Sequence, residues 1–480
     1  MQADLSGNLH LLWRAGFGPS AEDLPAVNKL DINSLYRQLL KNSSGKPEFL
    51  NVASGTLDGL VKGLQTEGKM QELSKEQKMQ IRKESREALK NLNLRWLNEM
   101  VSSKAQLREK LAFFWHGHFA CREINVYFQQ QLLDLIRTHA LSDFGTLLRE
   151  VSKSAAMLAF LNNQQNRKKQ PNENFAREVM ELFTLGRGNY SEQDIKEAAR
   201  AFTGWGFDLS GQFVFRKQFH DGGSKTIFGR TGYFDGDDVI NMLLEKRQTA
   251  YYITSKVYRF FVNEQVDEEH VRKLADSFYQ SGYNIQKLLE NIFLSSWFYE
   301  KKNIGAKIKS PVELITGIRR MLPMELGNEE VLLLYQRLLG QILFYPPNVA
   351  GWPGGRNWID SSSLMYRLRL PRLLKDDESI GVKPKDDDDV MMGQNDQVAG
   401  GRLQVAGRGM VNVKINWPEY SSKFNNISRD KLGISIASNL LQAGQIDLDL
   451  LNSYADMNDR ESYIRSFTVQ VMSLPEYQMM

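Results

Sequence analysis

The sequence predicts a mainly α-helical protein, a large helical domain that carries a small antiparallel β-hairpin. Leu, Met and Trp recur at helical intervals among the many charged residues between Ser74 and Leu111, a pattern typical of long amphipathic helices. A second pattern, with aromatic residues at even spacing, appears at Phe213, Phe215 and Phe219, just after a Ser-Gly turn. The first pattern indicates the helices and the second indicates the hairpin.

Helix start and stop signals divide the chain in order. In NLHLLWRAGFGPSAEDL a short helix stops at the glycines, and a new helix begins at Pro19. Two more helices are expected between Ile124 and Leu161. The segment SEQDIKEAARAFTGW begins with a capping box, Ser191 with Asp194 three residues later, and stops at Gly204.

The rest of the chain alternates regular and irregular segments. The hairpin insertion is expected near 207–232, and helices resume near Gly236 and continue to about Leu339. The prolines and glycines of LFYPPNVAGWPGGRNWIDSSS exclude a regular helix and predict an ordered aromatic loop. Its Trp352 and Trp358 are expected to pin the loop to the body of the protein rather than to stack on sugars or bases.

The predicted organisation has three parts. Residues 1–374 form the helical core, and residues 411–480 form a C-terminal helical segment that packs on it. Between them, residues 375–410 combine acidic runs with many glycines and are expected to be a flexible linker or loop.

Composition excludes several classes of protein. The formal net charge of +4 over 480 residues does not predict a nucleic-acid partner. No apolar run approaches the roughly 20 residues of a transmembrane helix. The single cysteine, Cys121, excludes an internal disulfide framework. The first residues show no signal peptide, although an exported protein whose leader had been removed would look the same.

The stretch QPNENFAREVMELFTLGRG contains the first candidate site. On a helix, Asn174, Arg177, Glu178 and Glu181 form one stripe, while apolar residues cover another. A solvated surface helix with Glu–Arg–Glu ion pairs would have the same pattern. Three capping-type residues follow Pro171, where one would suffice, and this favours a polar face turned inward.

The second candidate is the pair His116 and His118 in LREKLAFFWHGHFACRE, where the end of a helix is apolar nearly all round and is expected to be buried. On a regular helix the two side chains point roughly 200° apart, so joint metal binding requires the backbone to unwind at Gly117. Two separately hydrogen-bonded core histidines are the alternative.

The third candidate is QFHDGGSKTIFGRTG. Here His220 and Asp221 enter a Gly222-Gly223 turn followed by Lys225, and such a turn beside a lysine can cradle an anion. An ordinary glycine turn explains the segment equally well. It is not a P-loop, because Ser224 stands where the glycine before the lysine is required.

Several long motifs resemble, in the same order along the chain, a bacterial domain-of-unknown-function family numbered eighteen hundred, DUF1800. They are HLLWRAGFGPS, EKLAFFWHGHF, NENFAREVMELFTLGRGNYSEQDIKEAARAFTGW, HDGGSKTIFGRTG, IKSPVELI, FYPPNVAGWPGGRNWI and SLPEYQ. The resemblance covers nearly the whole chain. It implies a member of an uncharacterised family, often exported to the periplasm or cell envelope, whose genes often neighbour one for a sulfatase-like protein. It assigns no catalytic residue.

Two functional hypotheses follow. The first is a hydrolase with a buried His/Glu site that acts on an anionic or polymeric substrate. Its catalytic residues would be Glu178, Glu181 and His220, its substrate-binding residues Arg177, Lys225 and Asn174, and its metal ligands His116 and His118, with zinc or manganese as the metal. The second is a non-catalytic envelope partner or scaffold for a sulfatase-like protein. The hydrolase hypothesis requires the histidines and the glutamates to meet at one solvent-reachable pocket.

Overall fold

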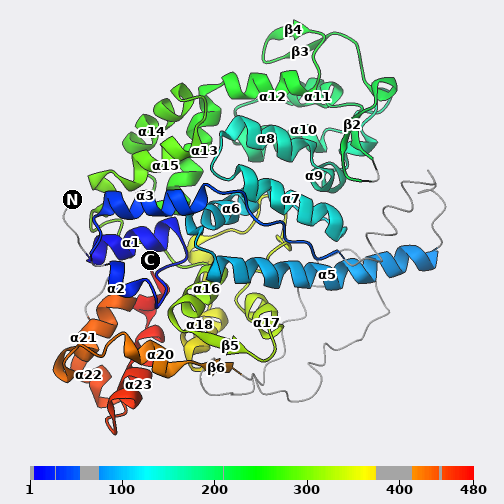
Figure 1. Ribbon diagram of the computed structural model, residues 1–480. Helices are drawn as coiled ribbons and strands as arrows, with labels where there is room; N and C mark the ends of the chain where they lie inside the picture. Colours follow the sequence, from blue (N-terminus) through cyan, green and yellow to red (C-terminus); the bar gives the residue numbers. More distant parts are fainter. Residues whose placement is uncertain (1–4, 28, 54–74, 209, 374–412, 443–445) are drawn as a thin grey trace.

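The computed structural model describes residues 5–27, 29–53, 75–208, 210–373, 413–442 and 446–480. Helices dominate these residues, and three two-stranded antiparallel sheets accompany them (Figure 1). The predicted fold class is therefore confirmed. In the described part, no helix has both the length and the apolar character needed to cross a membrane.

Helices follow one another along most of the described chain. The first half forms α1 (Leu5–Ala15), α2 (Leu24–Val27), α3 (Ile32–Ser43), α5 (Lys75–Ser102), α6 (Gln106–His118), α7 (Val126–His139), α8 (Phe144–Lys153), α9 (Ala155–Phe160), α10 (Asn174–Met180) and α11 (Glu192–Ala201). The second half forms α12 (Gly236–Glu245), α13 (Arg247–Phe261), α14 (Glu268–Gln280), α15 (Ile285–Phe293), α16 (Pro311–Met321), α17 (Val331–Leu338), α18 (Ser361–Leu373), α20 (Trp417–Ser422), α21 (Arg429–Leu440), α22 (Leu448–Ser453) and α23 (Arg460–Met472).

The strands are short and lie at the edge of the helical body. They are β1 (Trp205–Phe207), β2 (Phe213–Phe215), β3 (Lys225–Ile227), β4 (Arg230–Gly232), β5 (Met324–Leu326) and β6 (Val413–Ile415). The β-rich region was expected to hold one hairpin, but it holds two, β1–β2 and β3–β4. Phe219 belongs to a 3-10 turn between them, so the even aromatic spacing ends at Phe215. The pairing of β5 with β6 was not predicted.

Local signals set the helix ends as the sequence predicts. The Ser191 side chain accepts a hydrogen bond from the Asp194 amide, and the Asp194 side chain accepts one from the Ser191 amide, so the capping box at α11 is complete. The same reciprocal pair of bonds begins α16 at Ser310 and Glu313. Helix α11 ends at Ala201, and Gly204 with a φ of +82° turns the chain into β1.

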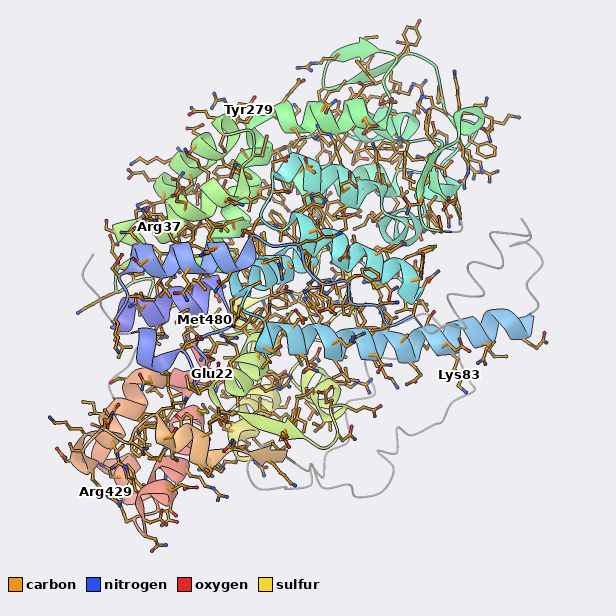
Figure 2. The ribbon with its side chains drawn as sticks, in the orientation of Figure 1. Glu22, Arg37, Lys83, Tyr279, Arg429 and Met480 are labelled. Carbon is orange, nitrogen blue, oxygen red and sulfur yellow. The ribbon has the colours of Figure 1, made fainter. Side chains whose placement is uncertain are left out.

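Helix α6 is the centre of the core. Apart from Gly117, all of its residues are buried, including the charged side chains of Arg108, Glu109 and Lys110. Helix α5 packs beside it, and the Lys83 end of α5 extends beyond the other helices (Figure 2). The buried end of α6 predicted from the sequence is confirmed, and buried charges accompany it.

The chain end returns to the N-terminal helices. Met480 is fully buried, and its main-chain oxygen accepts a 2.8 Å hydrogen bond from Nη2 of Arg14 in α1 (Figure 2). Helices α20 to α23 pack on one another, and α23 also packs on α18 (Figure 1). The linker expected at 375–410 lies outside the described residues.

Candidate functional site

A solvent-accessible groove with a volume of about 710 Å³ contains the glutamates of the first candidate site. One wall comes from α10 and the residues that follow it, and the other comes from the aromatic loop between α17 and α18. The groove is lined by Arg177, Glu178, Glu181, Leu182, Arg187, Gly188, Tyr190, Glu192, Asn348, Val349 and Ala350. Two segments far apart in the sequence therefore form one candidate site.

A π-helical turn, Glu181–Leu185, continues α10 and shapes the groove wall. The Thr184 hydroxyl donates a 2.6 Å hydrogen bond to the Val179 carbonyl five residues earlier. Such turns insert an extra residue into a helix and are frequent at functional sites. Here the turn coincides with the place where Glu181 and Leu182 meet the groove.

The carboxylate of Glu181 is held on both sides. It accepts a hydrogen bond from the Tyr190 hydroxyl, and it forms an ion pair with Arg187, whose Nε lies 3.0 Å from Oε1. The hydrogen bond from Tyr190 is the main reason that the pKa of Glu181 lies below its usual value, and Arg187 adds to the effect. Glu181 is therefore a fixed, ionised group of the groove.

Glu178 differs from Glu181 in having no hydrogen-bond or ion-pair partner in the described part of the chain. It is half-buried, and burial raises the pKa of its carboxyl group, with the nearby charge of Glu181 raising it further. The two groove carboxyls, three positions apart, thus have pKa values shifted in opposite directions.

Arg177 was expected to serve the glutamate stripe of its own helix, but it forms no hydrogen bond or ion pair with Glu178. Its guanidinium donates to Glu192 at 2.8 and 2.9 Å and to Glu173 at 3.1 Å. Asn174 does not line the groove; its side chain donates to the Leu161 carbonyl at 3.3 Å. Of the predicted stripe, Arg177, Glu178 and Glu181 line the groove and Asn174 does not.

Helix α13 supports the π-helical turn from behind. Tyr252 donates to the Leu182 carbonyl at 3.2 Å, and Gln248 donates to the Leu185 carbonyl at 3.0 Å. His118 lies 3.2 Å from the Phe183 carbonyl through Nε2. Because Nε2 must donate there, Nδ1 is free to accept from Lys256, whose Nζ is 3.3 Å away.

The two histidines of α6 have separate surroundings. Helix α6 continues through Gly117 to His118, so the backbone does not unwind to bring them together. His116 accepts a 3.2 Å hydrogen bond from the Phe344 amide and packs its ring at 5.5 Å from Trp352. Burial lowers the pKa of His116 to about 3, so the ring is neutral. This arrangement matches the alternative of two separately bonded core histidines.

No residue of the third candidate segment lines the groove. Nδ1 of His220 lies 2.9 Å from the Thr203 carbonyl. Lys225 donates to the carbonyls of Asp221, at 2.5 Å, and Gly223, at 3.1 Å, so it closes its own turn. Within the described ranges, no group of three or more His, Cys, Asp or Glu side chains is placed to hold a metal ion. The convergence expected of the three histidines is not found there.

The aromatic loop packs on the body of the protein. Trp358 is 7% exposed, and a side chain added at Gly351 would come within 2.4 Å of the Gly117 carbonyl. The loop thus rests on the end of α6, and Asn348–Ala350 reach the groove from this position. The expected packing role of Trp358 is confirmed.

Sequence reasoning missed Tyr190, Arg187 and Asn348 as groove residues. A signal for the first two was present, because Gly186 and Gly188 follow α10 and both have positive φ values, of +77° and +84°. Glycines at such spacing indicate a chain reversal that returns Tyr190 to Glu181. Asn348 carries no comparable signal.

The comparisons with known proteins give one match. The family model described as "Protein of unknown function (DUF1800)" matches residues 10–479. The searches of curated proteins and of solved structures found no match. The groove, the α6 histidines and the aromatic loop all lie within the matched residues, and the match spans nearly the whole chain. The protein therefore belongs to the DUF1800 family of proteins of unknown function.

Proposed function

We propose that the groove is the catalytic site of a hydrolase that uses Glu178 as its general acid–base group. The proposal rests on one observation, which is that two neighbouring carboxyl groups have different surroundings. Glu178 is half-buried and unpartnered in the described structure, whereas Glu181 is fixed by Tyr190 and Arg187. Pairs of carboxyls with pKa values moved apart are the usual arrangement for one proton carrier and one permanent charge.

Each groove residue then has a chemical role. Glu178 exchanges a proton with the leaving group or with an attacking water, because its raised pKa suits a proton carrier. Glu181 stays ionised and stabilises positive charge that develops in the transition state. Tyr190 and Arg187 hold Glu181 in place.

The shape of the groove favours a polymeric substrate. Arg187, Gly188 and Glu192 on its lining are exposed, so a long chain can lie across it without threading into the protein. Arg177 and Asn348 can donate hydrogen bonds to hydroxyl or carbonyl groups along such a chain.

The test is hydrolysis of a panel of polysaccharides, chromogenic glycosides and esters by the purified protein. We expect Glu178→Gln to reduce the rate by about 100-fold or more, the usual effect of losing a general acid–base group. Glu181→Gln should also reduce it, because the fixed charge is lost. Glu269→Gln is the matched control, since Glu269 forms an exposed ion pair with Lys273 on α14.

Equal rates for wild type, Glu178→Gln and the control on every substrate cleaved would overturn the assignment. Thermal unfolding of each variant identifies losses of rate that come from misfolding rather than from chemistry.

A second function, a non-catalytic partner of a sulfatase-like protein, is favoured by a different observation. His116, His118 and His220 are each bonded within their own neighbourhoods, as expected of residues that fix helix packing. Co-elution of the protein with a sulfatase-like protein, abolished by Arg177→Glu at the groove, would support this function. Failure of the two proteins to co-elute would contradict it.

A further inference from the structure

Glu178 and Glu181 reach the groove from one continuous stretch of helix. The Glu181 amide donates to the carbonyls of Arg177 and Glu178, so the helical geometry of α10 extends to Glu181, where the π-helical turn begins. Residues three positions apart on a helix have Cβ atoms roughly 5–6 Å apart. After burial, the charge of Glu181 is the next cause that raises the pKa of Glu178, as expected of close neighbours. The two carboxyl groups therefore lie near each other on one wall of the groove.

The lining of the groove limits the chemistry that it can perform. Among the described residues that line it, no serine, threonine, cysteine, histidine or lysine is present, so the usual nucleophiles of esterases and peptidases are missing from this lining. Its two arginines, Arg177 and Arg187, are paired with Glu192 and Glu181, and neither is a free cation for a phosphate or sulfate ester. Hydrolysis by two carboxyl groups is the chemistry of glycosidases and of aspartic proteases.

The bonds of Glu181 distinguish between these two classes. In an aspartic protease the two carboxyl groups share one proton. Here Glu181 bonds to Tyr190 and Arg187, and within the described residues no hydrogen bond joins it to Glu178. One proton donor beside one permanent carboxylate is the arrangement of glycosidases. The helical spacing suits retaining glycosidases, whose carboxyl groups are about 5–5.5 Å apart, better than inverting ones, in which they are about 6.5–9.5 Å apart.

This inference rests on the proposed hydrolase and names the bond that it cleaves. We propose that the groove cleaves glycosidic bonds of a polysaccharide with retention of the anomeric configuration, with Glu181 as the nucleophile and Glu178 as the acid and then the base.

The reaction has two displacements. In the first, Oε1 of Glu181 bonds to the anomeric carbon, the bond from that carbon to the leaving oxygen breaks, and the leaving oxygen takes the proton of Glu178. In the second, a water gives a proton to Glu178 while its oxygen bonds to the anomeric carbon, and the bond to Glu181 breaks. Each displacement inverts the anomeric carbon, so the two together restore its configuration. Both glutamates return to their starting states, and one water is consumed.

The surroundings of Glu181 suit a nucleophile. Tyr190 holds Oε2, whereas Oε1 pairs with Arg187, whose side chain is 88% exposed and can move aside for a sugar. Tyr190 itself is not expected to attack the sugar. Burial, and next the hydrogen bond to Glu181, raises the pKa of Tyr190 to about 12, so the phenol stays protonated.

The first experiment uses the full-length wild-type protein. Cleavage of an aryl glycoside from the panel is followed by proton NMR, and we expect the first sugar released to have the anomeric configuration of the substrate. The protein is also incubated with 2-deoxy-2-fluoro glycosides that carry an activated leaving group, because the fluorine slows the second displacement. Mass spectrometry of the digested protein should then find the sugar on Glu181 and not on Tyr190.

Azide separates the roles of the two glutamates. Glu181→Ala should lose hydrolysis, and with azide it should form a glycosyl azide of the configuration opposite to the substrate, because azide takes the place of the missing carboxylate. Glu178→Ala should form a glycosyl azide of the same configuration as the substrate from an activated aryl glycoside, because azide attacks the sugar bound to Glu181. Glu269→Ala, which removes an exposed ion pair on α14, is the control and should hydrolyse the substrate as the wild type does.

The wild-type measurements decide the matter if the alanine variants do not fold. A first product of inverted configuration, or a label on a residue other than Glu181, overturns this inference and leaves the proposed hydrolase in place. Hydrolysis of esters without hydrolysis of any glycoside has the same meaning. Hydrolysis of no substrate in the panel contradicts the proposed hydrolase and this inference together.

Discussion

Arg137 and Glu109 form an ion pair in the core, with 2.9 Å between Nε and Oε2 and neither side chain accessible to solvent. Glu109 also accepts hydrogen bonds from Nε1 of Trp96, at 3.0 Å, and from Nε of Arg108, at 3.1 Å. This one carboxylate therefore connects α5, α6 and α7.

Glu109→Ala should lower the free energy of unfolding by about 3–5 kcal/mol, because it leaves a buried arginine without its main counter-charge. The control is Glu245→Ala, which breaks the exposed pair with Arg230 and should cost less than about 1 kcal/mol. Denaturant unfolding of both variants checks the difference. Similar losses of unfolding free energy in the two variants would mean that the buried pair stabilises the protein no more than the exposed one.

Glu178→Gln should change the free energy of unfolding by less than about 1 kcal/mol, because no described residue depends on Glu178 for a bond. Arg177 keeps its partners Glu173 and Glu192 in this variant. Glu181→Gln, by contrast, weakens two bonds and should cost about 1 kcal/mol. A loss of several kcal/mol at Glu178 would show that the carboxyl has a structural role instead.

The opposite pKa shifts predict opposite pH dependences for these variants. The raised pKa of Glu178 means that its protonated form contributes stability below the ordinary value of 4.5, and this contribution is lost as the pH rises through the folded value. Glu178→Gln, neutral at every pH, should therefore gain stability relative to wild type as the pH rises.

The lowered pKa of Glu181 has the reverse consequence. Its ionised form contributes stability above 4.5, which is lost as the pH falls through the folded value. Glu181→Gln should therefore lose stability relative to wild type as the pH rises. Unfolding curves between about pH 4 and 7 test both signs, and parallel profiles for the two variants would contradict the assignment.

The sequence predicts those features of the fold that depend on residues close together in the chain. The capping box of Ser191 and Asp194 needs residues three positions apart, so it is visible in the sequence and present in the structure. The pairing of β5 with β6 brings together residues 324–326 and 413–415, and no local pattern in the sequence predicts it. Long-range pairing depends on the packing of all the helices between the two strands.

In the candidate site, too, the sequence predicts the local features and not those that depend on packing. The side on which Glu178 and Glu181 lie follows from helical spacing, and both residues line the groove. Whether His118 or His220 would join them depends on distances that packing sets, and the groove lining includes neither histidine. The π-helical turn at Glu181–Leu185 is stabilised by side chains of α13, about 70 residues away, as the bond from Tyr252 to Leu182 shows.

Gly186→Ala should destabilise the protein more than Gly188→Ala. Both glycines have positive φ, which costs a residue with a side chain roughly 1–2 kcal/mol. At Gly186 the added carbon would also lie 2.8 Å from the Tyr252 ring, whereas at Gly188 nothing lies within 4 Å. The clash should add about 1–3 kcal/mol and disturb the turn that carries Glu181. Thermal unfolding of the two variants makes the comparison, and equal midpoints would contradict it.

Gly351→Ala should move the second wall of the groove. The added carbon would lie 2.4 Å from the Gly117 carbonyl, which belongs to rigid, buried α6, so the loop must move rather than the helix. Trp352 follows Gly351, and its ring is 5.5 Å from that of His116, so the near-ultraviolet circular dichroism of the tryptophan should change. Gly354→Ala is the control, because Gly354 has a similar positive φ of +70° with nothing within 4 Å. We expect Gly351→Ala to lose hydrolytic activity or ligand binding at the groove, while Gly354→Ala retains it. If both variants retain activity and the Trp352 signal does not move, the Asn348–Ala350 wall plays no part in the site.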